Sequence, residues 1–577
     1  MDTARDDSNL RNLDFALWLA VTAVAAQVGC GDGDTTPDSG ATSSGTAVSL
    51  TDADGSSTTP TSAPPQTGTT DTTGTTGDLL PTGTSSTGTT GDLSTTGTAS
   101  TTTTTDGATT STTTDTTSTT GTSTDGGTTF ESTTATDEEA VCLALTDSDT
   151  AADPALWTRG HGVPGKYTAP WEVAVAPDGA VTSHLTFVGA LDLGDGTVDT
   201  QGQSYHALVR YAATGEFQWS AHVVPVVFDN TYSQIVETAM AVDCAGNVVV
   251  GGSFTGRIAI QNQILTAVPG TETQDDLVFP TEDMFLVKFG PDGARHWARR
   301  FGDDDHQRIH DLVIQADGTI VVGGASRGDL DLGGEPIVSD DYVGLLAAFD
   351  PGGSLVWQRT YEAASDVAVQ ALSVGPDDIL SAFGHAGGDT DFGGGPVVFT
   401  GDPTFVAQFE ADGAHRWSAR FFDDKRSPYR LGTDAARGVV FTGSSGLDHF
   451  VARYDETGQL AWNHDISPGD THLNVHALAV DDRIVLGGSL RGSFDFGGGA
   501  LTTPPDELRP FLAHYDLAGA PLTSSLHDSS WGYFTAADRG PDGELALLGR
   551  FFGTLDLGDG LLESVGEMDL FIHRAPQ

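Results

Sequence analysis

FGPDGARHW at 289–297, FEADGAHRW at 409–417 and YDETGQLAW at 454–462 are three versions of one pattern in this chain. Each begins with an aromatic residue, passes through an acidic turn and ends at Trp, with Gly four residues before that Trp. Gly supplies the positive φ that tight turns require, and short apolar runs flank the turn on both sides. The pattern therefore predicts a β-hairpin that recurs along the chain.

The hairpin belongs to a longer repeat in which three columns of residues keep their spacing. The Trp column is Trp157, Trp219, Trp297, Trp357, Trp417 and Trp462. The Gly column is Gly215, Gly293, Gly353, Gly413 and Gly458, and the aromatic column is Tyr211, Phe289, Phe349, Phe409 and Tyr454. Tyr515 and Gly519 continue both columns, which makes Thr523 the equivalent of a lost Trp. Because the columns repeat so strictly, we expect them to form a repeat core that packs unit against unit, and not a stacking array for carbohydrate or bases.

A second pair of short strands precedes each hairpin. Examples are AMAVDCAGNVVVGGSF at 239–254, DLVIQADGTIVVGGAS at 311–326 and ALAVDDRIVLGGSL at 477–490, where we expect Gly-Gly to end the second strand. Five units then carry a further turn of the DLGDG or DFGGG type, as at 192–196 and 391–395. Four short strands in units of about 60 residues, without a long amphipathic helix, predict an all-β chain folded as a β-propeller.

The number of units and the ends of the repeat predict seven blades. The last unit stops before its fourth strand, whereas Leu156 and Trp157 form a Trp strand with no blade before it. We expect this N-terminal strand to complete the last blade and close the ring, which removes an exposed sheet edge. The unit at 219–297 replaces the DFGGG turn with a longer insertion, and the unit at 417–462 lacks it.

These repeats resemble the SBBP-like seven-bladed propeller repeats of large bacterial secreted proteins and lipoproteins. The resemblance rests on the aromatic, Gly and Trp columns together with the D-x-x-G, V-V-x-G and D-F/L-G-G-G segments, and it covers about residues 155–577. It implies a propeller fold in an extracellular setting. It implies no single reaction.

An export signal is predicted at the N-terminus. Phe15 to Gly29 is an uncharged apolar run, shorter than the about 20 residues of a bilayer span, and Cys30 follows it directly. The arrangement resembles a bacterial lipoprotein signal, which implies lipidation of Cys30 and a lipid anchor in the outer membrane or at the cell surface. Gln27 stands where that family usually has Leu. The alternative is cleavage after Ala23-Val24-Ala25, which would release a soluble secreted protein.

Three regions follow from composition: a signal at 1–30, a tether at 31–140 and the propeller at 141–577. Between residues 41 and 140, 56 of 100 positions are Ser or Thr, and residues 31–140 contain fifteen acids without Lys or Arg. So little apolar surface cannot offset the entropy of ordering a backbone, so we expect a disordered tether. Its dense Thr could also be O-glycosylated.

The charge of the chain excludes some partners. The sequence has 80 Asp and Glu against 26 Lys and Arg, a net charge of −54, and most of this charge lies in the repeat region. Binding to nucleic acid or to an anionic bilayer needs clustered cations, so we exclude nucleic acid and allow a membrane only through the lipid anchor. An unknown protein, a glycan or a cation remains as partner, and we expect a monomer.

Few residues suggest chemistry. The Asp-Gly turns offer carboxylates that suit calcium, but each turn lies in a different blade, so a structural turn is the preferred interpretation. The run Asp303, Asp304 and Asp305 is the better cation candidate, although a solvated loop is preferred there too. HExxH, GxSxG and phosphate-loop motifs are absent, so we predict no catalytic residues and no cofactor other than possible calcium.

The cysteines suggest one covalent link. If Cys30 is lipidated, Cys142 and Cys244 remain, and an exported setting favours a disulfide between them. The alternative is two free thiols.

Three functions remain open. The preferred hypothesis is a non-enzymatic binding module at the cell surface, and the alternatives are a hydrolase or lyase with its active site at the channel mouth, or a structural surface protein. A cluster of non-repeating His, Asp, Glu or Arg at the channel mouth, with an acid–base pair within hydrogen-bond reach, would replace the binding module by the enzyme.

Overall fold

The computed structural model describes residues 156–575, except 167, 228–232, 275–276, 400–403, 422–426, 446–447 and 470. The predicted signal, the tether, Cys30 and Cys142 lie outside the described residues. No helix among the described residues has the length and apolar character needed to cross a bilayer.

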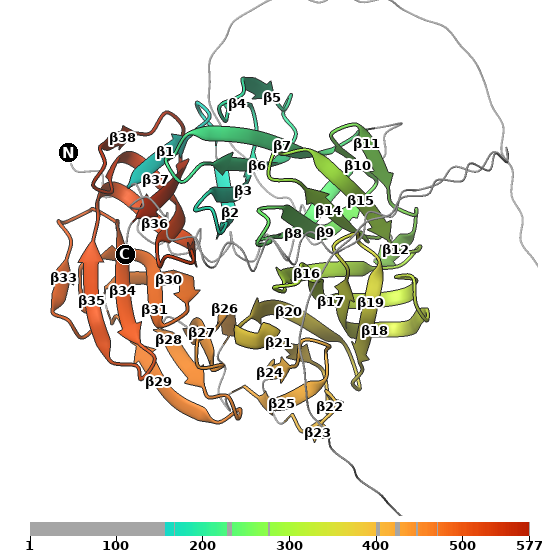
Figure 1. Cartoon of the computed structure of the whole chain (residues 1–577). Coiled ribbons are helices and arrows are strands. Elements are labelled where there is room, and N and C mark those ends of the chain that lie inside the picture. The colour runs from blue at the N-terminus through green and yellow to red at the C-terminus, as the bar shows by residue number, and fades with distance from the viewer. Residues whose placement is uncertain are drawn as a thin grey trace, which may run out of the picture. The chain divides into compact units, whose positions relative to one another are not determined.

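The described residues form seven antiparallel sheets arranged as blades around a central axis, as Figure 1 shows, and the region around this axis is called the channel below. This confirms the predicted all-β, seven-bladed propeller. Blade 1 is β2 (Thr168–Val175), β3 (Val181–Phe187), β6 (Tyr205–Tyr211) and β7 (Phe217–Pro225); blade 2 is β8 (Gln234–Val242), β9 (Val248–Thr255), β14 (Asp283–Phe289) and β15 (Arg295–Phe301); blade 3 is β16 (Gln307–Ile314), β17 (Ile320–Leu330), β18 (Ile337–Phe349) and β19 (Leu355–Tyr361). Blade 4 is β20 (Val367–Val374), β21 (Leu380–Ala386), β24 (Thr404–Phe409) and β25 (His415–Arg420); blade 5 is β26 (Ser427–Thr433), β27 (Val439–Ser445), β28 (Asp448–Tyr454) and β29 (Leu460–Ile466); blade 6 is β30 (His472–Val480), β31 (Arg483–Arg491), β34 (Arg509–Asp516) and β35 (Pro521–Leu526).

Blade 7 is built from both ends of the described chain, as predicted. It contains β36 (Asp528–Arg539), β37 (Leu545–Asp556), β39 (Asp569–Ala575) and, as its outer strand, β1 (Trp157–His161). β1 pairs with β39 along its whole length, with Trp157 opposite Arg574. The Thr158 hydroxyl also bonds His573 Nδ1 at 2.9 Å. The closed ring leaves no blade without its fourth strand.

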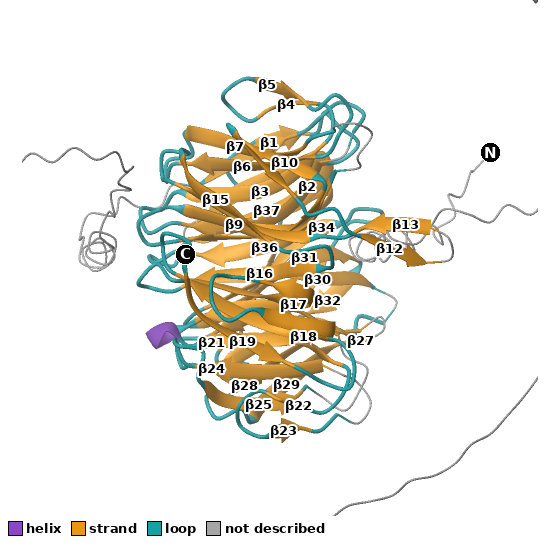
Figure 2. Ribbon diagram, turned by 90° about the vertical axis from the view of Figure 1, so that its right-hand side faces the viewer, coloured by secondary structure: helices purple, strands orange, loops and turns teal. Residues whose placement is uncertain are grey.

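Additional short hairpins connect the second and third strands of several blades. They are β4 (Ala190–Asp192) with β5 (Thr197–Asp199), β22 (Thr390–Asp391) with β23 (Pro396–Val397), and β32 (Ser493–Asp495) with β33 (Ala500–Thr502), while β38 (Leu561–Glu563) pairs with β37. In blade 2 the predicted insertion forms β10 (Arg257–Ile260) and β11 (Gln263–Thr266), which extend the sheet of blade 1 through β7. It also forms β12 (Thr271–Gln274) and β13 (Leu277–Pro280), a hairpin that projects from the ring in Figure 2.

The core lies between neighbouring blades. The second and third strands of a blade are covered on both faces, so β9 and β14 are buried at every residue, and their sequences are mostly apolar. The outer strands β15 and β19 are only half-buried or exposed along most of their length. The innermost strands of neighbouring blades contact one another around the whole ring and surround its axis.

The Gly-Gly pairs lie inside the second strand, so the expectation that they end it is wrong. Gly323 and Gly324 are both within β17, opposite a β-bulge in β16. A Cβ on Gly324 would stand 1.9 Å from the carbonyl oxygen of Arg308, because the bulge pushes this carbonyl against the neighbouring strand. The same clash with an inner-strand carbonyl would occur at Gly252, Gly384, Gly488 and Gly549.

Candidate functional site in the central channel

The outer rim of the ring uses the repeat columns to join each blade to the next. The indole N–H of four rim Trp residues donates to a carbonyl in the hairpin turn of the following blade: Trp157 to Ala213 at 3.1 Å, Trp219 to Pro291 at 2.8 Å, Trp297 to Pro351 at 3.0 Å and Trp462 to Leu517 at 3.0 Å. Trp417 instead donates to Gln408 Oε1 of its own blade at 3.1 Å. The Gly of that turn lies beneath the ring. A Cβ on Gly293, whose φ is +78°, would stand 2.7 Å from Trp219. The Gly column is therefore required both for the turn and for the Trp of the preceding blade.

Thr523 shows why one Trp is missing. It stands opposite His514, as Trp297 stands opposite Lys288, so it occupies the Trp position of blade 6. The following blade is blade 7, whose outer strands β39 and β1 come from opposite ends of the described chain and have no hairpin turn between them. A Trp at Thr523 would therefore have no Gly turn to cover.

The Asp-Gly turns use their carboxylates within the turn. Asp391 Oδ1 accepts from the N–H groups of Gly393 and Gly395, at 2.7 and 2.9 Å, and these bonds lower the pKa of Asp391. Asp495 makes the same two bonds with Gly497 and Gly499. These geometries support the structural interpretation of the turns.

The acidic run at 303–305 is also engaged in local bonds. Asp303 accepts hydrogen bonds from Gln307 and from the backbone of Asp305 and Asp329, and Asp305 forms an ion pair with Arg327 at 2.7 Å. Asp304 is exposed. Within the described ranges, no group of three or more His, Cys, Asp or Glu is arranged to hold a metal ion.

Cys244 lies in the turn between β8 and β9 and is disulfide-bonded. Cys142, its expected partner, lies outside the described residues, so the pairing stays a prediction.

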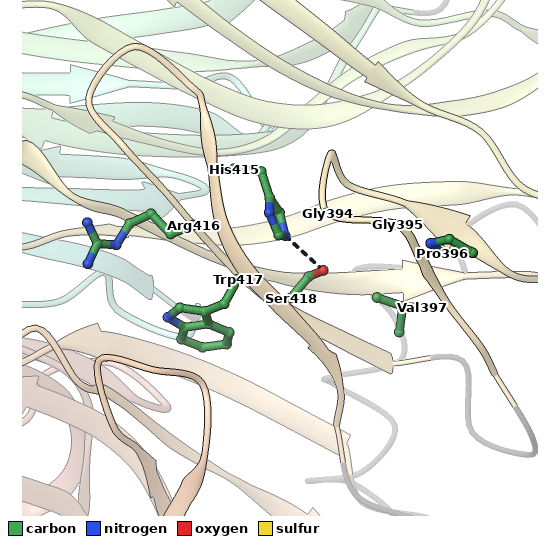
Figure 3. A pocket seen from close by; sticks show the side chains of 8 residues that line it. All are labelled: Gly394, Gly395, Pro396, Val397, His415, Arg416, Trp417 and Ser418. Carbon is green, nitrogen blue, oxygen red and sulfur yellow. Dashed lines mark hydrogen bonds between the residues drawn. The ribbon is translucent and has the colours of Figure 1, made fainter.

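A shallow pocket of about 610 Å³ on blade 4 is formed by the DFGGG turn and β25 (Figure 3). His415 Nε2 bonds the Ser418 hydroxyl at 3.0 Å. A Cβ on Gly394 would stand 2.2 Å from His415, and Phe217 and Pro521 pack on the turn glycines of their own blades in the same way. His415 therefore occupies a repeated packing position, and the nearby Asp391 carboxylate is already bonded to the turn.

Cations on the third strands are mostly used for structure. Lys288 pairs with Asp243 at 3.2 Å, Arg453 with Asp434 at 2.5 Å and Arg574 with Glu544 at 3.2 Å. Each acid belongs to the turn, or its edge, that joins the two innermost strands of the same blade. These buried pairs hold the turns to the blades.

The channel contains a set of residues that breaks the repeat. In each blade a tight turn joins the innermost strand to the second strand. The residue three positions before the last paired residue of the innermost strand defines one position per blade, and we call these seven positions the channel ring. Its members are Glu172, Ala239, Asp311, Ala371, Arg430, Ala477 and Ala536. Four blades have Ala there, whereas blades 1, 3 and 5 carry a charge.

Both ring carboxylates accept hydrogen bonds from the innermost strand of the next blade. Glu172 Oε2 accepts from the N–H of Met240 at 2.5 Å, and Asp311 Oδ2 accepts from the N–H of Leu372 at 2.7 Å. Asp311 Oδ1 also accepts from Leu312 at 2.8 Å. Backbone contacts therefore fix the orientation of both carboxylates.

Arg430 reaches across two further blades. Its Nε donates to the carbonyl of His476 at 3.1 Å and its Nη2 to that of Thr535 at 3.2 Å, while Nη1 bonds Tyr429 of its own strand at 3.3 Å. Its side chain is exposed even though β26 is an innermost strand, which shows that solvent reaches the channel here. Within the part of the chain that the structure describes, Arg430 makes no ion pair.

Electrostatics connects the three charged members of the channel ring. Burial, and after it the charge of Asp311, raise the pKa of Glu172 to about 8, against the charge of Arg430 and the Met240 N–H bond. Burial likewise raises the pKa of Asp311 to about 6, against the backbone N–H bonds and Arg430. At neutral pH Glu172 is therefore protonated whereas Asp311 is ionised.

The residues just before the channel ring are the extra residues of β-bulges in six blades. This bulge row is Trp171, His310, Gln370, Tyr429, His476 and Thr535. Bulges re-aim side chains, and here no two neighbouring blades carry the same residue. Because the bulge row precedes the ring along each innermost strand, it lies toward the face where these strands begin.

Two acid–base pairs involve the bulge row. His310 Nδ1 bonds Glu237 Oε2 of the preceding blade at 2.6 Å, with both side chains partly accessible. Tyr429 bonds His449 Nδ1 at 2.8 Å. Burial would raise the pKa of Glu237, but the charge and hydrogen bond of His310 lower it. The innermost strands therefore carry non-repeating charged residues together with one hydrogen-bonded His–Glu pair.

The sequence reasoning missed every member of this site. A usable signal existed, because aligning EVAVAPDG at 172, DLVIQADG at 311 and ALSVGPDD at 371 shows a column that is Ala in most blades and charged in three. A departure from the repeat is what a binding site should produce.

Solved structures similar to this chain are propellers of several kinds. No family model and no curated protein matches the sequence. Virginiamycin B lyase from Staphylococcus aureus is 8% identical with a TM-score of 0.36, over 72% of this chain and 99% of that one. YCF48 bound to a D1 peptide is 10% identical with a TM-score of 0.33, over 74% and 100%. An ulvan lyase is 10% identical with a TM-score of 0.34, over 71% and 97%. Likeness at this level concerns the fold alone.

Proposed function

We propose that this chain is an exported, lipid-anchored propeller that takes a polar ligand into its central channel and acts on it as a hydrolase or lyase. The observation that carries the proposal is the hydrogen bond between His310 and Glu237 at the channel, at 2.6 Å. A carboxylate on Nδ1 fixes the imidazole and leaves Nε2 for proton transfer. Among the described residues, Nε2 of His310 has no hydrogen-bond partner.

The channel ring supplies the other groups that acid–base chemistry needs. Glu172 holds a proton at neutral pH because burial raises its pKa to about 8, so it can serve as the proton donor. Arg430 presents a guanidinium that can stabilise negative charge as it develops on a ligand. The charge of Arg430 acts on both Glu172 and Asp311, so these groups share one region of the channel.

Turnover assays on the full-length protein test this proposal. A panel of chromogenic esters and glycosides, and of polysaccharides assayed for reducing ends and unsaturated uronates, would be compared between wild type and His310→Gln. General-base catalysis contributes about 10²- to 10⁴-fold, so the variant should lose that much turnover. His464→Gln is the matched control, because His464 bonds Gly519 on the rim, and it should keep full turnover. Equal turnover in both variants would contradict the assignment.

A non-enzymatic binding module is the second candidate. It is favoured by the backbone bonds that hold Glu172, Asp311 and Arg430, since a preformed polar surface suits recognition without turnover. Binding of a ligand without any conversion, and unchanged in His310→Gln, would select this candidate.

The anchor is tested separately. Cys30 follows an apolar run of export-signal length, which supports lipidation. Metabolic labelling with a fatty acid, together with cell fractionation, should label the wild type in the membrane fraction and leave Cys30→Ala unlabelled. Label that persisted in Cys30→Ala would remove the anchor.

A further inference from the structure

The insertion of blade 2 carries a hairpin that belongs to no blade. β12 and β13 pair only with each other among the strands that the structure describes, and they project from the ring in Figure 2. The DLGDG and DFGGG hairpins are also two-stranded, but their turn glycines pack on the outer strand of their own blade, as Gly394 does on His415. A projecting two-stranded hairpin is only marginally stable in water, and a third strand stabilises it.

The base of this hairpin is fixed to blades 2 and 3. The N–H of Val268 donates to Asp283 Oδ2 at 2.9 Å, and the buried Asp283 also pairs with Arg300. The carbonyl of Glu282 accepts from the N–H of Gln307, the first residue of β16, at 2.8 Å, which places the base on the face where the innermost strands begin. The hairpin is therefore held at its base before any partner arrives, which reduces the ordering cost of binding.

The register of the hairpin shows which backbone groups point outward. The N–H of Thr281 donates to the carbonyl of Gly270 at 3.4 Å, and Thr271 pairs with Pro280 at the next position. Hydrogen-bonded and non-hydrogen-bonded pairs alternate along an antiparallel ladder, so Thr271 and Thr273 direct their N–H and C=O groups away from β13. The outer edge of β13 is incomplete because Pro280 has no N–H. β12 therefore presents the complete edge for a further strand.

The sequence around this edge selects the charge of a partner. Residues 258–287 contain five acids and no Lys or Arg, and three of these acids lie in the hairpin at 271–280. An extended segment rich in Lys or Arg is attracted to such a surface. The tether at 31–140 has fifteen acids without Lys or Arg, and a second copy of this chain carries a net charge of −54, so both are repelled.

We propose that β12 binds an extended, basic segment of another protein, which adds a strand to the hairpin through the backbone of Thr271 and Thr273. In strand addition the main-chain hydrogen bonds supply affinity, and here the acids supply the charge preference. This inference concerns a protein partner and goes beyond the reaction proposed for the channel.

Binding of the detergent-solubilised full-length protein to an array of immobilised synthetic peptides tests the edge. The peptides follow the alternating pattern of strands and form basic, neutral and acidic sets, and a duplicate of each is methylated on its backbone nitrogens. Wild type should bind the basic set. Methylation should abolish this binding, because it removes the N–H groups that pair with β12.

Thr273→Pro is the informative variant, because it removes one outward N–H and leaves the bonds within the hairpin in place. Pro is tolerated at such edge positions, and Pro280 already occupies one on β13. The variant should weaken binding of the basic peptides by about 3- to 10-fold, the range for one neutral hydrogen bond. Thr273→Val keeps the N–H and is the matched control, so it should bind as wild type does.

Several results would overturn this assignment: a blank array, equal binding of the acidic and basic sets, binding that survives methylation, or full binding by Thr273→Pro. A dimer in solution that Thr273→Pro dissociates would also overturn it, since a second copy would then occupy β12. His310→Gln should leave peptide binding unchanged. Binding lost in His310→Gln but kept in Thr273→Pro would place the peptide in the channel instead. A blank array leaves the proposed reaction standing, because that reaction is measured by turnover.

Discussion

The rim and the channel are built from the same repeated unit but follow opposite rules. At the rim, Trp219 covers Gly293 of the next blade, and Trp157 donates to Ala213 in the same way. In the channel ring, the corresponding residue is Ala in four blades and Glu172, Asp311 or Arg430 in the other three. Residues that repeat from blade to blade therefore form the contacts that join blades, whereas positions that do not repeat mark where the blades differ in chemistry.

The comparison also separates two uses of charge. Lys288 and Arg574 are buried in ion pairs with turn acids, where they serve the blade that carries them. Arg430 is exposed and bonds carbonyls of two other blades. We therefore expect substitutions at the rim to change stability, and substitutions in the channel to change ligand chemistry and pH response.

The largest effect is expected at a rim Trp. Trp219→Thr removes a buried ring that covers the next blade and should destabilise the protein by about 3–5 kcal/mol, as for other large core truncations. The reverse change, Thr523→Trp, should alter stability by less than about 0.5 kcal/mol, because blade 7 has no turn to receive the ring. Urea unfolding measures both. A clear gain in stability from Thr523→Trp would break the explanation of the missing Trp.

The turn glycine beneath the Trp should be the next most sensitive position. Gly293→Ala combines a left-handed backbone, which costs about 1–2 kcal/mol, with overpacking against Trp219, which costs about 1–3 kcal/mol. Gly202 has a φ of +87° and open space around it, so Gly202→Ala should show only the backbone cost. Thermal denaturation compares the two. Equal losses would mean that Trp219 does not restrict this position.

A channel substitution should change the pH dependence of stability instead. The folded state raises the pKa of Glu172 to about 8, so it binds more protons than the unfolded chain and loses stability as pH rises from about 5 to 8. Glu172→Gln keeps an acceptor for the Met240 N–H and removes this loss, so it should gain stability over wild type toward pH 8. Urea unfolding at several pH values measures the difference. Parallel curves for the two proteins would show that folding does not raise the pKa of Glu172.

Calcium should have the smallest effect. The Asp391 carboxylate already accepts two turn N–H groups, and Asp303 and Asp305 are bonded to their own neighbours. Excess calcium should therefore leave the Tm unchanged in both wild type and Asp391→Asn. A calcium-dependent rise in Tm that Asp391→Asn abolishes would show that the turns bind the ion.

The rim could be predicted from the sequence because its contacts repeat. The Trp and Gly columns predicted the blades, the closing strand at Trp157 and the equivalence of Thr523, since each has the same local cause in every unit. The channel site could not be found in this way, because Glu172, Asp311 and Arg430 are far apart in sequence and come together only when the ring closes. The bulges were missed because they depend on close packing of the first and second strands of a blade. Gly324 was an indication of this packing, because a side chain there would clash with the neighbouring strand.

The closure of blade 7 has a consequence for the order of folding. Thr158 and His573 bond across 415 residues, so the ring cannot close until residues 569–575 have left the ribosome. Contacts between such distant residues form slowly, because the intervening chain must first be ordered. For a chain that we propose is exported, this late step keeps the ring open during synthesis, and a chain in that open state can still be threaded through a translocation pore.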